Sequence, residues 1–405
     1  MRWLDVNRHT IWLVGGTRPE AIKLAPLVIA LKRQGLMRPV VVATGQHPSM
    51  FRRTLGNFGL RPDIEVHPQR DTGSQAELVS QVTEQLDHKL LLDMPSAVVV
   101  QGDTTSTFVG ALVAFWREIP VVHLEAGLRS YDLAAPFPEE ANRRMIGQIA
   151  ALHLAPTPSA AANLTAEGVP ANLIEVIGNT AVDAVLRLAG QRNPFIEPAL
   201  EAVERATAEG RRLVLVTVHR RESWGEPLRT VLWALRDILD TYPDLVVALP
   251  AHPNPSVRAD VESILGGDRR VVLTDPVDHS DLIRLLELST LVLTDSGGIQ
   301  EEAPSFGVPV LVLRDKTERT EAVEAGCAFL VGTDRSVVAA AASRLLSSED
   351  VREQLRDVGN PFGDGHAGQR AAVALARLLG LSVQPMAPFE PRHVGLPLPA
   401  QRTNG

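Results

Sequence analysis

Short runs of β-branched and aliphatic residues alternate along the chain with longer stretches in which apolar residues recur at helical spacing. In the first half, four such runs predict strands at residues 10–14, 40–43, 97–100 and 121–124, and a helical segment follows each of them. Regular alternation of strand and helix predicts a parallel sheet with crossover helices.

The same alternation begins again in the second half. Five strands are predicted at residues 212–218, 245–249, 270–273, 290–294 and 308–313, after a charged helical stretch at 198–211 that has no strand signal. We therefore predict an α/β protein with two domains, joined near residues 183–194. No short sequence period recurs, which argues against a solenoid.

Composition adds limits on partners and location. The 40 Lys and Arg residues stand against 48 Asp and Glu, a net charge of −8, so no excess positive charge attracts nucleic acid or anionic lipid, and we expect neither nucleic acid nor membrane as a partner. The single cysteine, Cys327, excludes an intramolecular disulfide and a multi-cysteine metal site. With no signal peptide and no apolar run of about 18 residues, we expect a cytoplasmic protein.

The C-terminal end has a different composition. Residues 382–405 contain five prolines and no helical periodicity, so we expect a poorly ordered, proline-rich tail.

Ligands of parallel α/β sheets bind outside the carboxyl ends of the strands, so the residues after each strand are the first candidates for a ligand site. The first strand leads into a turn of two glycines in which Thr17 and Glu20 have capping-box spacing. Arg18 on this turn and Lys23 one turn into the helix place two cations at a helix N-terminus, which suits a phosphate or an acidic substrate. Both could instead be solvated surface cations.

Three carboxylates follow. Asp103 and Glu125 come directly after the third and fourth predicted strands, so neighbouring strands would bring two acids into one site with separate acid and base roles. Asp103 could instead cap a helix that begins at Thr104. Glu125 has no such alternative, because a loop follows it. Glu139 occupies a predicted first helical turn, where the helix dipole favours glutamate in any case.

The second half repeats the arrangement with other residue types. His219 and Arg220 follow its first strand, and a histidine beside cations in a loop favours anion binding over a structural role. Near residue 295 a strand ends at Ser296, Gly297 and Gly298 and leads into a helix with two glutamates, an arrangement that suits a diphosphate and a ribose. The histidines form no HExxH pattern, so we expect no metal.

Together these segments resemble the bacterial non-hydrolysing UDP-N-acetylglucosamine 2-epimerases, from about residue 11 to residue 379. The resemblance rests on ten motifs in order: GTRPEAIKLAPL (16–27), TGQH (44–47), QGDTTST (101–107), HLEAGLRS (123–130), FPEEANRR (137–144), IGNTAVDA (177–184), HRRESWGEPL (219–228), HPNP (252–255), TDSGGIQEEAPSFGVPVLVLRDKTERTEAV (294–323) and NPFGDG (360–365).

The resemblance implies two Rossmann-like domains in the glycosyltransferase-B arrangement, with the active site in the cleft between them. The first domain would span residues 1–185 and be joined by a C-terminal helix at 366–379, and the second, UDP-binding domain would span 186–365. It also implies a homodimer, no cofactor, and a product used in polysaccharide biosynthesis.

For catalysis, the resemblance implies anti elimination of UDP, a 2-acetamidoglucal intermediate, and re-addition of UDP after carbon 2 is reprotonated from the other face. The family's catalytic residues match Asp103, Glu125, Glu139 and His219. Substrate contacts match Arg18, Lys23, Asp103, Glu125, His219, Val277, Leu282, Ser296, Gly297, Gly298, Glu302 and Arg319. Leu282 stands where many relatives have an aromatic residue beside the uracil. A second UDP-N-acetylglucosamine could bind as an activator at Gln46, Glu139, Arg220 and His252.

Several alternatives stay open. A hydrolysing relative would release N-acetylmannosamine and UDP, and other relatives epimerise a different UDP-2-acetamido sugar. A glycosyltransferase of the same fold and a sensor of nucleotide sugars without catalysis are further possibilities, although three acids in the first domain favour proton transfer.

Overall fold

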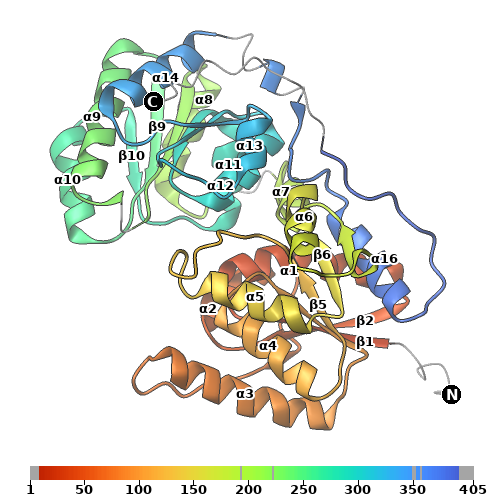
Figure 1. Ribbon diagram of the computed structural model, residues 1–405. Coiled ribbons are helices and arrows are strands. Elements are labelled where there is room, and N and C mark those ends of the chain that lie inside the picture. The colour runs from red at the N-terminus through yellow and green to blue at the C-terminus, as the bar shows by residue number, and fades with distance from the viewer. Residues whose placement is uncertain (1–8, 192–193, 221–222, 349–352, 356–357, 392–405) are drawn as a thin grey trace. The chain divides into compact units, whose positions relative to one another are not determined.

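The computed structural model describes residues 9–191, 194–220, 223–348, 353–355 and 358–391. Within this part, the chain forms two compact units: residues 9–184 with 362–391, and residues 185–361. The first unit ends at Ala184, where the sequence predicted residue 185. The chain rejoins the first unit at Phe362, whereas the sequence predicted that it would do so at residue 366. Each unit is an α/β structure with helices on both faces of one parallel sheet (Figure 1), which confirms the predicted fold class.

The first unit is built on a seven-stranded parallel sheet with the order β3-β2-β1-β4-β5-β6-β7. Its strands are β1 (His9–Gly15), β2 (Met37–Ala43), β3 (Ile64–Glu65), β4 (Ala97–Gln101), β5 (Val121–Leu124), β6 (Leu152–Ala155) and β7 (Ile174–Val176). Its helices are α1 (Arg18–Gln34), α2 (Pro48–Gly56), α3 (Gln75–Leu92), α4 (Thr105–Trp116), α5 (Glu139–Ile149), α6 (Pro158–Ala166), α7 (Thr180–Leu188), which runs on into the second unit, and α16 (Ala367–Leu378).

The second unit repeats this design with six parallel strands in the order β10-β9-β8-β11-β12-β13. The strands are β8 (Arg212–Thr217), β9 (Leu245–Pro250), β10 (Val271–Thr274), β11 (Ser289–Thr294), β12 (Val310–Val312) and β13 (Ala328–Leu330). The helices are α8 (Glu201–Ala208), α9 (Glu226–Thr241), α10 (Pro255–Leu265), α11 (His279–Leu288), α12 (Gly297–Glu302), α13 (Thr320–Glu324) and α14 (Arg335–Ser347), with short 3₁₀ turns at η2 (Pro198–Leu200) and η4 (Ala303–Phe306). A further 3₁₀ turn, η1 (Ala171–Leu173), lies in the first unit before β7.

Continuous apolar runs explain why the central strands form. β4 is buried at all five positions and β9 at all six, the pattern of strands covered by helices on both faces. In the first unit, Trp12, Val98 and Val100 pack against the buried stripe of α3 at Leu78, Val82, Leu86 and Leu90, which has helical spacing.

Strand order reverses once in each sheet, and this point locates the ligand site of a doubly wound fold. In the first unit β1 pairs with β2 on one side and with β4 on the other, and in the second unit β8 lies between β9 and β11. The segments after β1, β4, β8 and β11 are those in which the sequence places Arg18, Asp103, His219 and Ser296.

Helix α16 returns to the first unit and packs against α1. A partly buried carboxylate holds its start: Asp183 of α7 accepts the backbone N–H groups of Ala367 and Gly368 at 3.2 and 2.8 Å. Gly368 lies so close to the backbone of Pro26 in α1 that a Cβ atom there would come within 2.9 Å. This close contact explains the glycine.

The predicted disorder of the tail does not describe residues 382–391. The Phe389 side chain is 4% exposed, its N–H donates to the Val176 carbonyl at 2.9 Å, and Arg370 lies over its ring. Burial of the apolar Phe389 side chain therefore holds residues 382–391 in place, although the prolines of this segment suggested disorder. Residues 392–405 of the predicted tail lie outside the described residues.

Two features are absent from the described residues. Within these ranges no helix has the length and apolar character needed to cross a bilayer. The same part of the chain brings no three His, Cys, Asp or Glu side chains together as metal ligands would be.

Candidate active site

The turn after β1 is held by a buried glutamate. Glu20 is fully buried and accepts the N–H groups of Gly16 and Thr17 at 2.9 and 2.7 Å, as the capping-box spacing predicted. Its other oxygen accepts the hydroxyls of Thr104 and Thr107 at 2.7 and 3.0 Å. Burial raises the pKa of Glu20, and the hydrogen bonds oppose this. Glu20 thereby joins the turn after β1 to the turn after β4.

Arg18 and Lys23 have different surroundings. Arg18, at the first position of α1, is partly exposed, whereas the Lys23 side chain is only 12% exposed and its ammonium pairs with the Glu125 carboxylate. Lys23 is thus part of the acid cluster and not a solvated surface cation, because its charge is buried against an opposite charge.

Glu125 has an unusual backbone. Its φ is 66°, in the left-handed region that non-glycine residues seldom occupy. Its two carboxylate oxygens are held separately, one by Lys23 and the other by the side-chain amide of Gln101 at the end of β4. A strained backbone at a doubly fixed carboxylate is typical of a functional residue.

Asp103 is not a helix cap. Thr104 is the N-cap of α4 and accepts the Thr107 N–H, so that alternative is wrong. The Asp103 carboxylate instead pairs with the Arg143 guanidinium of α5 at 2.7–2.8 Å, and the Asn142 side chain donates to the Asp103 carbonyl. β4 and β5 are adjacent, as the two-acid hypothesis required, so Asp103 and Glu125 follow neighbouring strands.

The glutamate pair at the start of α5 divides into two roles. Glu140 is fully buried and accepts the N–H groups of Ser130 and Tyr131 at 2.9 and 3.2 Å, which fixes the loop before α5. Glu139 is partly exposed and lies one turn before Arg143 on the same helix face. Since Arg143 contacts Asp103, Glu139 lies on the face of α5 that is directed at Asp103.

A neutral histidine lies beneath these acids. His123, two residues before Glu125, contacts the Gly102 carbonyl through Nε2 at 2.7 Å, so Nε2 carries the proton. Burial lowers the pKa of His123 to about 4, and the neighbouring His153 and Arg129 charges act in the same direction. The ring is therefore uncharged at neutral pH and fixes the turn that carries Asp103.

In the second unit, Asp295 holds the loop after β8. Its fully buried carboxylate accepts the N–H groups of His219 and Arg220 at 3.0–3.1 Å and the Ser223 hydroxyl at 2.9 Å. His219 thus has a backbone fixed from the adjacent strand end and a side chain that is partly exposed. Arg221 and Glu222 of the same motif lie outside the described residues.

The N-terminus of α12 lies against a cation. The Arg319 guanidinium is so close to Gly297 that a Cβ there would come within 3.0 Å of Cζ, which explains the glycine. Arg319 also contacts Glu301 at 2.9 Å. The Ser296 N–H donates to the Thr294 hydroxyl, whereas the N–H groups of Gly297 and Gly298 belong to the first helical turn, which has no carbonyl partner within the helix.

The remaining predicted contacts lie on two neighbouring segments. Glu302, at the end of α12, is 6% exposed and contacts Nε2 of His279 on α11 at 3.1 Å. Val277 is buried just before α11, and Leu282 is partly exposed on that helix.

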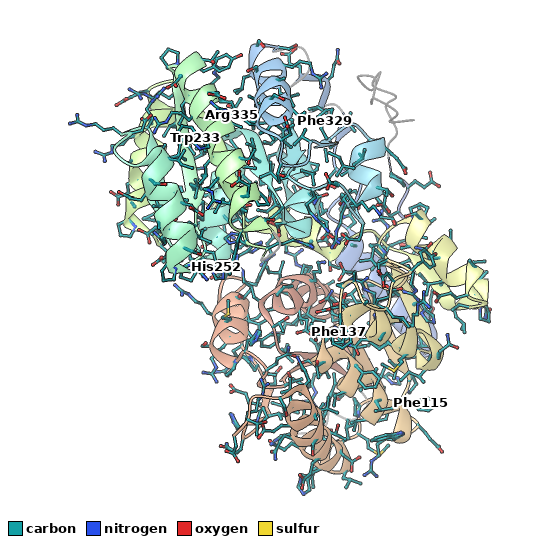
Figure 2. The ribbon with its side chains drawn as sticks, turned by 60° about the vertical axis from the view of Figure 1, so that its left-hand side comes forward. Phe115, Phe137, Trp233, His252, Phe329 and Arg335 are labelled. Atoms are coloured by element: carbon teal, nitrogen blue, oxygen red, sulfur yellow. The ribbon has the colours of Figure 1, made fainter. Side chains whose placement is uncertain are left out.

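The residues suggested for an activator are divided between the units. Gln46 accepts the Ser106 hydroxyl at 2.7 Å in the first unit. In the second, the His252 ring packs on Trp224 with centroids 4.8 Å apart (His252 is labelled in Figure 2), and its Nδ1 accepts the Asn254 N–H.

Several residues that fix the site were not singled out from the sequence: Glu140, Arg143, His279 and Asp295. Each of these residues contacts a partner in another segment, so no pattern in its own segment indicated its role. Glu20 differs from them, because its spacing from Thr17 indicated a capping box. Cys327 is buried, and burial raises the pKa of its thiol to about 12, so it supplies no nucleophile.

Comparison with known proteins identifies the family of the chain. Residues 29–376 match the family model described as UDP-N-acetylglucosamine 2-epimerase. The UDP-N-acetylglucosamine 2-epimerase of Bacillus subtilis is 42% identical over 365 residues, which cover 90% of this chain and 94% of that protein. The Staphylococcus aureus MnaA–UDP structure is 40% identical, with a TM-score of 0.84 over 94% of this chain and 100% of that one.

A second solved structure, the Neisseria meningitidis UDP-GlcNAc 2-epimerase bound to UDP-GlcNAc, is 36% identical with a TM-score of 0.82, and the match covers 91% of this chain and 100% of that one. Sequence and fold therefore agree over nearly the whole length of the chain and of these relatives. The chain belongs to the UDP-N-acetylglucosamine 2-epimerase family.

Proposed function

We propose that this epimerase interconverts UDP-N-acetylglucosamine and UDP-N-acetylmannosamine without hydrolysis. The observation that carries the proposal is the acid cluster of the first unit, in which Asp103 and Glu125 follow adjacent strands and each is paired with a cation. Inversion at carbon 2 needs a proton removed from one face of the sugar and returned to the other, and so needs two groups that handle protons.

The proposed reaction has two halves. In the first, a carboxylate takes the proton from carbon 2 while the bond from carbon 1 to the diphosphate oxygen breaks, which gives 2-acetamidoglucal and UDP. In the second, a protonated carboxyl on the other face gives a proton to carbon 2, and the UDP oxygen bonds to carbon 1 again. Atoms and charge balance without an oxidant or a cofactor.

We assign the proton transfers to two of Asp103, Glu125 and Glu139. Lys23 and Gln101 hold the Glu125 carboxylate in one orientation, and Arg143 does the same for Asp103. Fixed orientation favours these groups because proton transfer requires a hydrogen-bond distance to the reacting atom. The third carboxylate and His219 would stabilise the charge that develops at carbon 1 and on the leaving group.

The UDP contacts would come mainly from the second unit, with Arg18 added from the first. Arg319, His219 and the N–H groups of Gly297 and Gly298 suit the diphosphate. Glu302 suits the ribose hydroxyls, and the segment from Val277 to Leu282 suits the uracil. In support, relatives have been solved with UDP and with UDP-GlcNAc. The proposal includes the expected glycosyltransferase-B arrangement of the two domains.

A homodimer is part of the proposal, and exposed apolar side chains support it. Leu92 and Trp116, at the C-terminal ends of α3 and α4, are 77% and 58% exposed, and Leu91, Met94 and Phe115 lie exposed beside them. A paired Asp87 and Arg117 join these two helix ends, and Phe115 lies at the outer edge of the first unit (Figure 2). Large apolar side chains gathered on a surface favour an interface. Trp116→Lys should convert a dimer to a monomer in sedimentation velocity; a wild-type monomer would contradict this.

Activation by a second UDP-N-acetylglucosamine at Gln46, Glu139, Arg220 and His252 is a further part of the proposal. It predicts sigmoidal kinetics in the forward direction and a lag in the reverse direction that added UDP-N-acetylglucosamine removes. Hyperbolic kinetics without a lag would contradict it.

Proton NMR with UDP-N-acetylglucosamine in deuterated water tests the reaction. We expect UDP-N-acetylmannosamine with deuterium at carbon 2, and starting material that remains at equilibrium. Free N-acetylmannosamine and UDP would instead identify a hydrolysing enzyme. Absence of turnover, with binding of UDP intact, would favour another UDP-2-acetamido sugar or a sensor.

A further inference from the structure

Glu302, the residue proposed to contact the ribose, forms a buried pair with His279, to which the proposed function gives no role. Oε1 of Glu302 lies 3.1 Å from Nε2 of His279, and the two residues are 6% and 2% exposed. A carboxylate oxygen can only accept, so Nε2 of His279 carries the proton. This hydrogen bond fixes one of the two oxygens of Glu302.

The other oxygen is available to a ligand. Oε2 of Glu302 is buried and, among the described residues, has no hydrogen-bond partner. A buried carboxylate oxygen without a donor costs free energy, and such atoms in native proteins call for an explanation. A ligand hydroxyl that donates to Oε2 would remove this cost.

His279 is itself held firmly in place. It is the first residue of α11, whose N-cap Asp278 accepts the Ser280 N–H. From the same helix, the buried Asp281 accepts the N–H groups of Ile196 and Glu197 at 3.0 and 2.9 Å. Two separate anchors therefore fix the start of α11, and with it the direction of the His279 ring.

We propose that His279 is a positioning residue that orients Glu302, so that Oε2 accepts a hydrogen bond from a ribose hydroxyl and the protein prefers ribonucleotides to deoxyribonucleotides. The inference rests on the proposed binding of UDP, which it deepens at the sugar of the nucleotide. His279 acts only through Glu302 and does not touch the ligand. Its removal should therefore weaken the contribution of the hydroxyls and leave that of the diphosphate and the base.

The test compares the Kd of UDP with that of 2′,3′-dideoxy-UDP by calorimetry, in the wild type and in two variants. Hydrogen bonds to charged groups predict that the wild type binds UDP about 10- to 100-fold more tightly than the dideoxy compound. In His279→Phe, which fills the space without a donor, this ratio should fall to about threefold or less. His279→Gln, whose amide can still donate, should restore part of it.

Glu287→Gln serves as the matched control, because Glu287 pairs with Arg284 farther along the same helix and takes no part in either anchor of His279. It should leave the ratio of the two Kd values at the wild-type level. A ratio in His279→Phe equal to that of the wild type would overturn the role of His279 and leave UDP binding intact. A wild type that binds UDP but does not distinguish the dideoxy compound would overturn the role of Glu302. A wild type that binds no UDP would overturn the proposed function as well.

Discussion

At the scale of single residues, the candidate site is built on carboxylates that each accept hydrogen bonds from more than one partner. Glu125 is shared between Lys23 and Gln101, and Asp295 between the backbone of one loop and the Ser223 hydroxyl. A carboxylate with two fixed partners cannot rotate, and so keeps one orientation for chemistry or for support.

Glu125→Gln should separate catalysis from binding. The amide keeps the shape of the side chain but cannot accept and return a proton, so turnover should fall by about 10²- to 10⁴-fold, a typical contribution of acid–base catalysis. The Kd of UDP should stay within about twofold. Glu65→Gln is the control, since Glu65 pairs with Arg52 at the surface and its loss should leave kcat unchanged. Normal turnover in Glu125→Gln would remove the mechanism.

Asp295→Ala should release the loop that carries His219. Loss of the acceptor for two backbone N–H groups and one hydroxyl should lower the free energy of unfolding by about 2–3 kcal/mol and kcat by about tenfold or more. Ser223→Ala removes only the hydroxyl contact and should have a clearly smaller effect on both quantities, measured by urea unfolding and by initial rates. Equal effects of the two variants would contradict the role given to Asp295.

At the scale of secondary-structure elements, the sequence predicted the strands made of aliphatic runs well and missed four short ones. β1, β4, β8 and β9 are buried runs of aliphatic residues, a strong signal. β3, β6, β7 and β13 were missed. They have two to four residues each, too short for a period, and they form because a neighbouring strand supplies the hydrogen bonds.

The site shows the same division. Strand ends and family motifs predicted Arg18, Asp103, Glu125 and His219 as site residues, and the structure places each of them after a strand end, because these positions follow from the strands themselves. Which carboxylate would hold which segment could not be predicted, because Asp183 and Asp295 accept backbone N–H groups about 184 and 75 residues away. Contacts of that separation depend on the completed fold.

Asp183, which caps α16, should titrate far from its usual range. Burial raises its pKa to about 6, although two backbone N–H groups oppose the shift. Its ionised form is therefore disfavoured in the folded chain, so its contribution to stability is lost as the pH rises from about 4 to about 6, by up to about 3 kcal/mol. Carbon-13 NMR of the carboxyl groups should find its midpoint near pH 6. A midpoint near pH 4 would contradict the described burial.

At the scale of the whole molecule, the two units should differ in their response to acid. Burial lowers the pKa of both His123 and His153 to about 4, and both lie in the first unit. Histidines that are neutral when folded stabilise fully above their unfolded pKa of about 6.5, and this stability is lost as the pH falls toward 4. The loss is about 3 kcal/mol for each, which outweighs the opposite effect of Asp183.

The first unit should therefore unfold at a higher pH than the second. In the second unit, the Arg270 guanidinium lowers the pKa of Asp268 to about 2, so this carboxylate loses its stabilising effect only below about pH 4. Trp12 lies in the core of the first unit and Trp224 packs against the core of the second. Variants in which Trp12 or Trp224 is the single remaining tryptophan therefore report the unfolding of one unit by fluorescence. A red shift of Trp224 before that of Trp12 on acidification would contradict this order.

The return of α16 also has a consequence for the order in which the protein is made. All proposed catalytic acids are synthesised before residue 140, yet α16, which packs against α1, follows only after the entire second unit. While the ribosome synthesises residues 185–361, α16 does not yet exist, so the face of α1 that packs against it remains exposed to solvent. The second unit, continuous in sequence, can fold first. A chain truncated before residue 367 would contain every acid of the cluster. Its first unit would still lack α16, and the face of α1 that packs against α16 would stay exposed.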